Sequence, residues 1–411
     1  MLQSLWQVFQ NRKMSSLLFL GFSSGLPLYL TSKTLQAWMT LEKVDLASIG
    51  WFSLVTIPYS VKFIWSPLLD SYTPPFLGRR RGWLLLCQIG LVIAIGTMSL
   101  QNPGKTLPIL ALNALLLAFF SATQDIGADA YRTDILLPAE RGTGVANFVL
   151  GYRLALIVTG SLAFILADHL GWPQIYLVMM GIMMLISLIS FWAPEPIPNS
   201  PPPANLHQAI FLPFLDFFQR QGNFKGVGIL AFIILYKLGD SLVNNMSTPF
   251  LLMNGFSQTD IGTINGGLGL LATIMGIILG GLLINRLGGN RSLWIFGGLQ
   301  SISTLSYFAL SVIGKNYLWM ILAINIEHFC AGLGTAAFLS FLMGLCNPRF
   351  SATQYALLSS FMAFSRDILV GPSGTIVEHM GWSMFFILSF LVAIPGLLLL
   401  PIFAPWSQDP D

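Results

Sequence analysis

Twelve long runs of apolar residues follow one another along the chain, and they restrict its fold more than any other feature of the sequence. Each run extends over roughly 20 residues, the length that an α-helix needs to cross the hydrocarbon core of a bilayer. Inside a bilayer every backbone amide needs a protein partner, so only helices or closed barrels can span it. The runs are continuously apolar and do not alternate as barrel strands would. We therefore predict an all-α membrane protein with spans at residues 14–38, 46–69, 83–101, 107–132, 143–167, 174–193, 224–252, 261–285, 292–313, 317–345, 353–377 and 383–404.

The composition supports this class and argues against several others. Of the 411 residues 55% are hydrophobic and only 9% are charged, which is more apolar surface than a soluble core could bury. The three cysteines and four histidines show no spacing typical of metal ligands or of a disulfide framework, and we expect no cofactor. A net charge of +3, scattered over short loops, does not indicate nucleic-acid binding.

The basic residues of the loops predict the orientation of the chain. Positive residues collect on the cytoplasmic side of membrane proteins. If the N-terminus is cytoplasmic, twelve basic loop residues fall inside and three fall outside, so we predict that both termini are cytoplasmic. The inner set is Arg12, Lys13, Arg79, Arg80, Arg81, Arg132, Arg141, Arg220, Lys225, Arg286, Arg291 and Arg349, and the outer set is Lys43, Lys105 and Lys315.

A proline-rich stretch and an internal repeat divide the spans into six and six. The stretch begins at Ala193-Pro-Glu-Pro and reads as a cytoplasmic linker over 194–223, between bundles at 1–193 and 224–411. Ala167-Asp-His-Leu-Gly-Trp172 after the fifth span matches Val377-Glu-His-Met-Gly-Trp382 after the eleventh. Parallel six-helix repeats are typical of the major facilitator fold, with twelve transmembrane helices in two pseudo-repeat bundles.

Apart from residues at the span ends, ten Asp, Glu, Lys and Arg residues lie inside the predicted spans, where each costs roughly 2.5–3.5 kcal/mol at the bilayer centre unless it pairs or faces water. None of the ten lies in the third, sixth, ninth or twelfth span. In the facilitator fold those four helices pack away from the central cavity, so we predict that the ten residues line it. They are Lys33, Lys62, Asp125, Asp129, Arg153, Lys237, Asp240, Glu327, Arg366 and Asp367.

The spacing of these residues suggests roles for several of them. Asp125 and Asp129 are four residues apart on one helical face, so their charges repel and one is expected to carry a proton. Lys62 and Arg153 have comparable depths and could sense that proton or an anionic substrate. The alternative is a charge network that only holds helices together.

The other intramembrane charges leave two interpretations open. Lys237 with Asp240, and Arg366 with its neighbour Asp367, could pair structurally or contact the substrate. Lys33 and Glu327 are placed nearer the outer helix ends, where a long side chain can extend to water. Lys33 is then either an entry residue for the substrate or an anchor.

Several long words in the first half resemble one family of transporters, the AmpG muropeptide permeases. The resemblance covers most of residues 15–195 and is thin over the second half. It is carried by Gly25-Leu-Pro-Leu28, Thr34-Leu-Gln-Ala-Trp-Met39, Lys62-Phe-Ile-Trp-Ser-Pro-Leu-Leu-Asp-Ser-Tyr-Thr-Pro-Pro75, Gly78-Arg-Arg-Arg-Gly-Trp83, Ser121-Ala-Thr-Gln-Asp-Ile-Gly-Ala-Asp-Ala130, Glu140-Arg-Gly142 and Leu150-Gly-Tyr-Arg153.

The resemblance implies an inner-membrane transporter that imports anhydromuropeptides, anionic sugar-peptide fragments of the cell wall, together with protons. Eukaryotic relatives of the family are described as acetyl-CoA transporters, so another anionic solute, such as an acyl-CoA or an anionic sugar, is the alternative substrate. Asp70 with Arg79 and Arg80 resembles the facilitator loop that locks one access state, although a positive-inside cluster would look alike. We expect a monomer in the lipid bilayer.

Two other classes of function are disfavoured. An intramembrane enzyme would need a nucleophile or metal motif, and the sequence has no His-Glu-x-x-His, Gly-x-Gly-Asp or Gly-x-Ser-x-Gly word. A channel or a sensor differs from a transporter in its kinetics, because saturable flux that follows an imposed proton gradient would exclude a channel.

Overall fold

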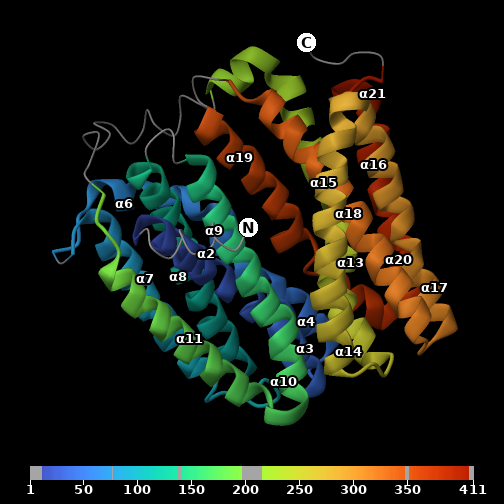
Figure 1. Ribbon diagram of the computed structural model, residues 1–411. Helices are drawn as coiled ribbons and strands as arrows, with labels where there is room; N and C mark the ends of the chain where they lie inside the picture. The colour runs from blue at the N-terminus through green and yellow to red at the C-terminus, as the bar shows by residue number, and fades with distance from the viewer. Residues whose placement is uncertain (1–11, 76, 137–140, 197–214, 348–350, 407–411) are drawn as a thin grey trace. The chain divides into compact units, whose positions relative to one another are not determined.

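The computed structural model describes residues 12–75, 77–136, 141–196, 215–347 and 351–406, and these ranges contain helices and turns but no strand. Figure 1 shows the helices as long rods, and α7 (Arg79–Met98) packs along both α8 (Leu107–Ile135) and α11 (Trp172–Trp192). Ten helical stretches in the described ranges are long and apolar enough to cross a membrane. The predicted all-α membrane class is therefore confirmed.

Two compact units make up the chain. The first comprises Met1–Glu42 and Val55–Ala204, and the second comprises Lys43–Leu54 and Asn205–Asp411. The second unit thus takes in a short segment of the first half, because α4 (Leu46–Trp51) packs against α20 (Ser373–Leu398). The division into two six-helix bundles at the linker stays a prediction.

Unit 1 is built from nine α-helices in the described ranges. They are α2 (Arg12–Leu30), α3 (Lys33–Leu41), α5 (Ile57–Val61), α6 (Ser66–Ser71), α7 (Arg79–Met98), α8 (Leu107–Ile135), α9 (Arg141–Ile157), α10 (Ala163–Leu170) and α11 (Trp172–Trp192). The turns η2 (Lys62–Ile64) and η4 (Val158–Leu162) also belong to this unit, and η1 (Phe52–Thr56) spans the boundary between the two units in the sequence. The second predicted span, with Pro58 and Pro67, is accordingly a series of short helices.

Unit 2 contains α4 and the helices of the second half. These are α13 (Asn223–Met253), α14 (Gln258–Asp260), η5 (Ile261–Gly269), α15 (Leu270–Leu287), α16 (Gly289–Ser303), α17 (Leu305–Ile313), α18 (Tyr317–Leu345), α19 (Ser351–Phe364), η7 (Ser365–Leu369), α20 and α21 (Leu400–Phe403). Gly381 breaks α20 with φ 77° and ψ 167°, so its two parts belong to the eleventh and twelfth predicted spans. The count of twelve spans is consistent with this arrangement.

The internal repeat reappears as repeated backbone geometry. Gly171 before α11 has φ 75° and ψ 157°, close to the values of Gly381. Gly78 before α7 and Gly288 before α16 have φ 85° and 84°. Both pairs are 210 residues apart (381 − 171 and 288 − 78). Positive φ favours glycine, which explains why the two halves keep these glycines at helix starts.

Glycines allow two pairs of helices to cross closely. A Cβ on Gly21 of α2 would lie 1.9 Å from the Phe148 carbonyl oxygen of α9. A Cβ on Gly276 of α15 would lie 2.2 Å from the Phe329 carbonyl oxygen of α18. Gly25 and Gly280, one helical turn further on, are also in close contact with α9 and α18, so small residues line both crossings.

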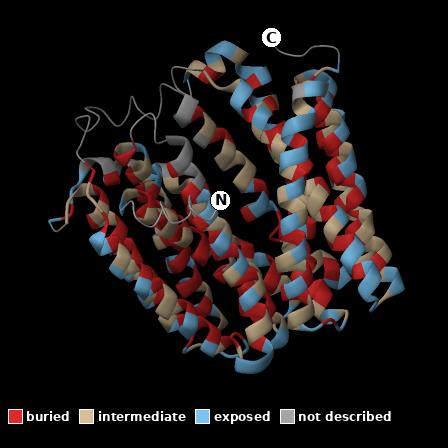
Figure 2. Cartoon of the chain, in the orientation of Figure 1, coloured by how far each residue is buried: buried red, intermediate tan, exposed pale blue. Residues whose placement is uncertain are grey.

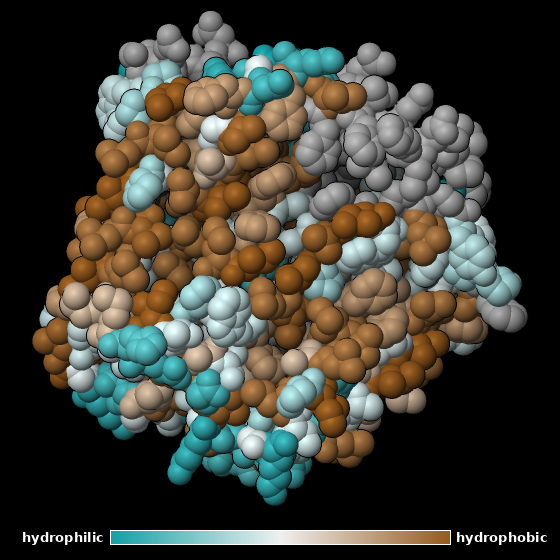
Figure 3. Space-filling model, turned by 180° about the vertical axis from the view of Figure 1, so that it is seen from behind, coloured by the Kyte–Doolittle hydropathy of each residue, from teal (hydrophilic) through white to brown (hydrophobic). Residues whose placement is uncertain are grey.

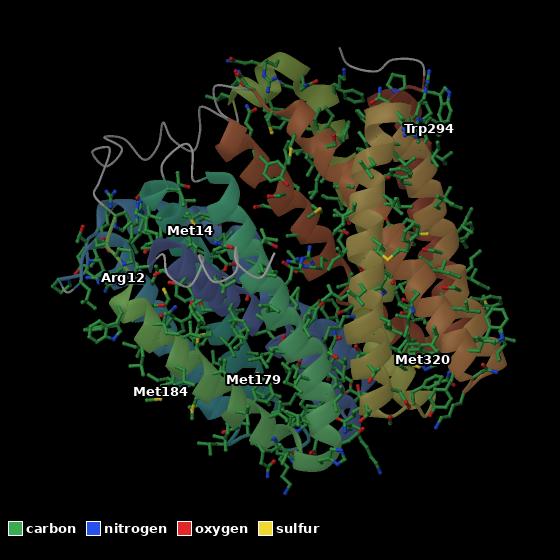
Figure 4. The ribbon with its side chains drawn as sticks, viewed as in Figure 1. Arg12, Met14, Met179, Met184, Trp294 and Met320 are labelled. Carbon is green, nitrogen blue, oxygen red and sulfur yellow. The ribbon has the colours of Figure 1, made fainter. Side chains whose placement is uncertain are left out.

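Apolar side chains cover the outside of the helices as well as the inside. On α11, Met179 is fully buried, whereas Met184 is exposed (both are labelled in Figure 4). Figure 2 shows buried and exposed residues alternating along the helices, and Figure 3 shows hydrophobic side chains over much of the visible surface. Such a surface would aggregate in water, but it suits contact with lipid.

The helical residues 215–221 dock on the ends of α18 and α19. Asp216 accepts hydrogen bonds from Gln354 at 2.8 Å and Asn347 at 3.0 Å, and it pairs with Arg220 at 3.0 Å. Partial burial acts to raise the pKa of Asp216, but these hydrogen bonds and the Arg220 charge outweigh it and hold that pKa below its usual value.

Candidate transport site

Asp125 occupies a polar position on α8 within unit 1. Its carboxylate is half-buried, hydrogen-bonds the Ser24 hydroxyl of α2, and lies close enough to Lys62 of η2 to feel its charge. The neighbouring Gln124 is fully buried and donates to the Ser23 hydroxyl at 3.0 Å, which fixes α8 against α2. When such a carboxylate takes up or releases a proton, its attraction to the nearby ammonium group changes.

Asp129 has a different environment from Asp125. Its side chain is 55% exposed and pairs with Arg132 at 3.0 Å on the same helix. Arg132 in turn lies over the Phe148 ring, 4.8 Å from its centroid. Asp129 still acts on Asp125 electrostatically, as the four-residue spacing predicted, but the two carboxylates do not share one buried site.

Two other cations predicted to line the cavity, Arg153 and Lys33, lie on elements that pack against α2. Arg153 of α9 is half-buried and interacts electrostatically with Tyr29 of α2. The Tyr29 ring covers Gly160, where a Cβ would approach it to 2.6 Å. Lys33 is half-buried at the first position of α3. Arg153 is thus placed near Tyr29 of α2, whereas Lys62 is placed near Asp125 of α8.

Lys237 and Asp240 form an ion pair inside unit 2. Lys237 is 6% exposed, and its Nζ lies 3.5 Å from Asp240 Oδ2, 3.3 Å from Gln300 Oε1 and 3.4 Å from Thr335 Oγ1. The second carboxylate oxygen, Asp240 Oδ1, is buried without a hydrogen bond. Four polar side chains from α13, α16 and α18 therefore meet in the apolar interior.

Arg366 and Asp367 pair within η7. The Arg366 Nε lies 2.7 Å from Asp367 Oδ1, and its Nη2 lies 3.2 Å from Oδ2. The Asp367 side chain is almost completely buried, whereas half of the Arg366 side chain is exposed. The wide π-helical turn lets two consecutive residues face each other, and the guanidinium leaves the interior while its partner stays inside.

A cluster of charges holds the start of α7 to the ends of α8 and α11. Glu195 accepts the backbone N–H groups of Arg80 at 2.9 Å and Arg81 at 3.0 Å, so it caps α7 from a distant part of the chain. Arg80 Nε pairs with Asp134 of α8 at 2.7 Å. Gly78 permits this approach, because a Cβ there would lie 2.7 Å from the Glu195 carboxylate carbon.

This cluster contains two of the three residues of the predicted gate. Arg79 and Arg80 both belong to it, with Arg79 Nη2 4.0 Å from Asp134. The side chain of Asp70 lies outside the described part of the structure. Asp134 and Glu195 were missed at the sequence level, although Pro194-Glu-Pro196 places a single acid at the start of the linker.

The family model of the Major Facilitator Superfamily matches residues 17–369, which is most of the chain. The chain belongs to the major facilitator superfamily. Its similarity to curated members of this superfamily extends over nearly the whole length. It is 49% identical to the anhydromuropeptide permease of Escherichia coli K12 over 96% of this chain and 80% of that protein.

Two other relatives are similar to this chain over nearly its whole length. The chain is 33% identical to the putative transporter AmpG 4 of Rickettsia felis, over 96% of this chain and 97% of that protein. It is 39% identical to an uncharacterized protein of Haemophilus influenzae, over 98% and 97%. These identities place the chain among the AmpG-type permeases of the superfamily, as the sequence words in the first half predicted.

Solved structures support the fold. A bacterial homologue of the human lysosomal transporter Spinster matches with a TM-score of 0.75, covering 97% of this chain and 99% of that one. The nucleoside transporter NupG matches with a TM-score of 0.72, over 96% and 100%. Both are 15% identical, so they establish the facilitator fold and nothing about the solute.

Proposed function

We propose that this chain imports anhydromuropeptides into the cytoplasm together with protons, by alternating access across the bacterial inner membrane. The observation that carries the proposal is the 49% identity to the E. coli anhydromuropeptide permease over 96% of the chain. Muropeptides carry peptide carboxylates, and cations inside the membrane such as Lys62 and Arg153 would complement them. Both termini are proposed to be cytoplasmic, and the protein is proposed to act as a monomer.

Asp125 is the proposed proton carrier, in preference to Asp129. Asp125 is half-buried beside Lys62, whereas Asp129 is exposed and paired with Arg132. While Asp125 is ionised it attracts Lys62. When a proton neutralises the carboxylate, the Lys62 ammonium becomes available to a substrate carboxylate, so proton binding and anion binding favour each other.

The remaining charges have proposed roles in substrate contact and gating. Lys33, Arg153, Lys237, Asp240 and Arg366 are proposed to contact the sugar-peptide during the cycle. The loop before α7 is proposed as a gate in which Arg79 and Arg80 act with Asp70. The contacts of Arg80 with Asp134 and Glu195 support a locking role for this loop.

Uptake by proteoliposomes tests the coupling. Asp125→Asn is expected to abolish accumulation of a labelled anhydromuropeptide driven by a proton gradient, while exchange of labelled for unlabelled substrate continues. Asp129→Asn is the matched control on the same helix and should retain most gradient-driven uptake. Gradient-driven accumulation by Asp125→Asn at the wild-type rate would show that another group carries the proton.

Substrate identity needs a separate test. Arg153→Gln should lose uptake of the anionic substrate while remaining folded in the membrane. A panel of anhydromuropeptides, other anionic sugars and acyl-CoA thioesters, presented to the wild type, should show saturable uptake of the anhydromuropeptides. Uptake of an acyl-CoA but not of a muropeptide would replace the proposed substrate.

A further inference from the structure

Glu327 is buried in the interior of unit 2, contrary to its expected position near water. It lies ten residues after the start of α18, about 15 Å along the helix axis. Only 3% of the residue is exposed. Its side chain therefore does not extend to the outer surface, and the expectation that it does so is wrong.

The neighbouring histidine is the partner of this carboxylate. His328 Nδ1 lies 2.7 Å from Glu327 Oε2, at the distance of an ion pair, although the nitrogen makes no aligned hydrogen bond. The His328 side chain is 21% exposed and that of Glu327 is 4% exposed. Among the residues that the structure describes, Glu327 has no lysine or arginine within ion-pairing distance.

In the described residues, the elements packed on α18 bring no other charge within ion-pairing distance of the pair. Lys237 of α13 contacts α18 at Thr335, eight residues from Glu327 or about 12 Å along the helix. The described residues of α17, η5 and α19 include no charged side chain, and α18 itself has only Glu327 and His328. Arg286 and Arg291 lie in the last turn of α15 and the first turn of α16. Ser303 at the end of α16 contacts Cys330, which lies near the pair. Arg291 is twelve residues before Ser303, or about 18 Å away along α16, and is therefore far from the pair.

Polar but uncharged groups complete the surroundings of Glu327. The Tyr307 hydroxyl of α17 is buried without a hydrogen bond and feels the Glu327 charge, as does the Cys330 thiol. The His328 ring packs on η5, where a Cβ on Gly269 would lie 2.8 Å from His328 Cδ2. The ring position therefore depends on the absence of a side chain at residue 269.

We propose that Glu327 and His328 together bind one proton, forming a second proton site of the transporter. An unpaired carboxylate is strongly disfavoured in a low-dielectric interior. One shared proton makes the pair neutral, either as carboxylate with imidazolium or as carboxylic acid with imidazole. Release of that proton leaves a net negative charge beside Tyr307, so occupancy of the site is coupled to the packing of α18 on α17 and η5.

Proton counting on the purified protein tests this inference. Bound protons are measured between about pH 9 and pH 5 with an indicator dye and by infrared difference spectroscopy. The double variant Glu327→Gln with His328→Gln should bind one proton fewer than the wild type, and the Glu327 carboxyl band should vanish. Equal proton counts in the two folded proteins would overturn the proposal.

A second variant keeps both titratable groups and moves one of them. Gly269→Ala should displace the His328 ring and shift the midpoint of the Glu327 band, whereas Gly281→Ala, with nothing within 4 Å of the added Cβ, should leave it unchanged. An unshifted midpoint in a folded Gly269→Ala protein would contradict the assignment to this pair. The inference deepens the proposed symport, but these measurements need no substrate. A failure of muropeptide uptake would leave the proton count unaffected, so the two proposals fail separately.

Discussion

Removal of the Asp240 carboxylate is expected to destabilise unit 2 by about 3 kcal/mol. Loss of one member of a buried ion pair typically costs about 3–5 kcal/mol, because the remaining charge stays buried without compensation. Lys237 is 6% exposed and would keep only the Gln300 and Thr335 oxygens at 3.3 and 3.4 Å. Those two acceptors place Asp240→Asn at the lower end of the range.

A double-mutant cycle separates the pair from its surroundings. Asp240→Asn, Lys237→Met and the double variant are purified in detergent, and the free energy of unfolding is measured in mixed micelles with rising denaturing detergent. Each single change should cost about 3 kcal/mol, whereas the double change should cost about 1 kcal/mol, because no unpaired charge then remains. The two single losses add to about 6 kcal/mol, so the expected coupling energy between the two side chains is about 5 kcal/mol.

Additive losses in the double variant would refute this reasoning, since they would mean that the two side chains do not stabilise each other. Uptake measured in parallel addresses the open choice between pairing and substrate contact. If the double variant recovers stability but not transport, Lys237 or Asp240 contacts the substrate. If it recovers both, the pair is structural.

Three further predictions follow from described contacts. Gly21→Ala should lower the free energy of unfolding by more than about 1 kcal/mol through a clash at the α2–α9 crossing. The control Gly181→Ala, which has open space around the added Cβ, should be neutral or stabilise by up to about 1 kcal/mol in the same unfolding assay. Glu195→Ala should cost about 1–2 kcal/mol by removing two backbone acceptors at the start of α7, with Glu195→Gln losing less; unchanged unfolding of the alanine variant would contradict the cap. The pKa of Asp216 is lowered in the folded protein, so its stabilising effect should be complete above about pH 4 and vanish as the pH falls further. Asp216→Asn should therefore destabilise the protein at pH 7 but not near pH 2, as measured by thermal unfolding at both pH values.

Local and periodic features of the fold could be predicted from the sequence. The long apolar runs predicted the spans because bilayer thickness sets their length. The matched words around Gly171 and Gly381 predicted the repeat, and both glycines indeed have positive φ at the start of a helix. The division of the second span, which contains Pro58 and Pro67, into short helices was not predicted.

Contacts that depend on tertiary packing could not be predicted in the same way. The i, i+4 spacing of Asp125 and Asp129 was visible, but whether Asp129 would turn to Arg132 depends on which face of α8 is covered. Glu327 was placed by its distance from a helix end, and that distance says nothing about the helices packed over it. Glu195 meets Arg80 across 115 residues, a separation at which no sequence periodicity gives a signal.

The cap on α7 constrains how unit 1 can move. Glu195 lies three residues after the end of α11 and accepts two backbone amides at the start of α7, while Arg81 donates to the Ala193 carbonyl oxygen at 2.8 Å. Helices joined at one end by these hydrogen bonds must move together as a rigid body when the transporter opens or closes. Spin labels attached to α7 and α11 near this cap should keep one constant separation through the transport cycle, and the bending that opens a pathway has to occur elsewhere.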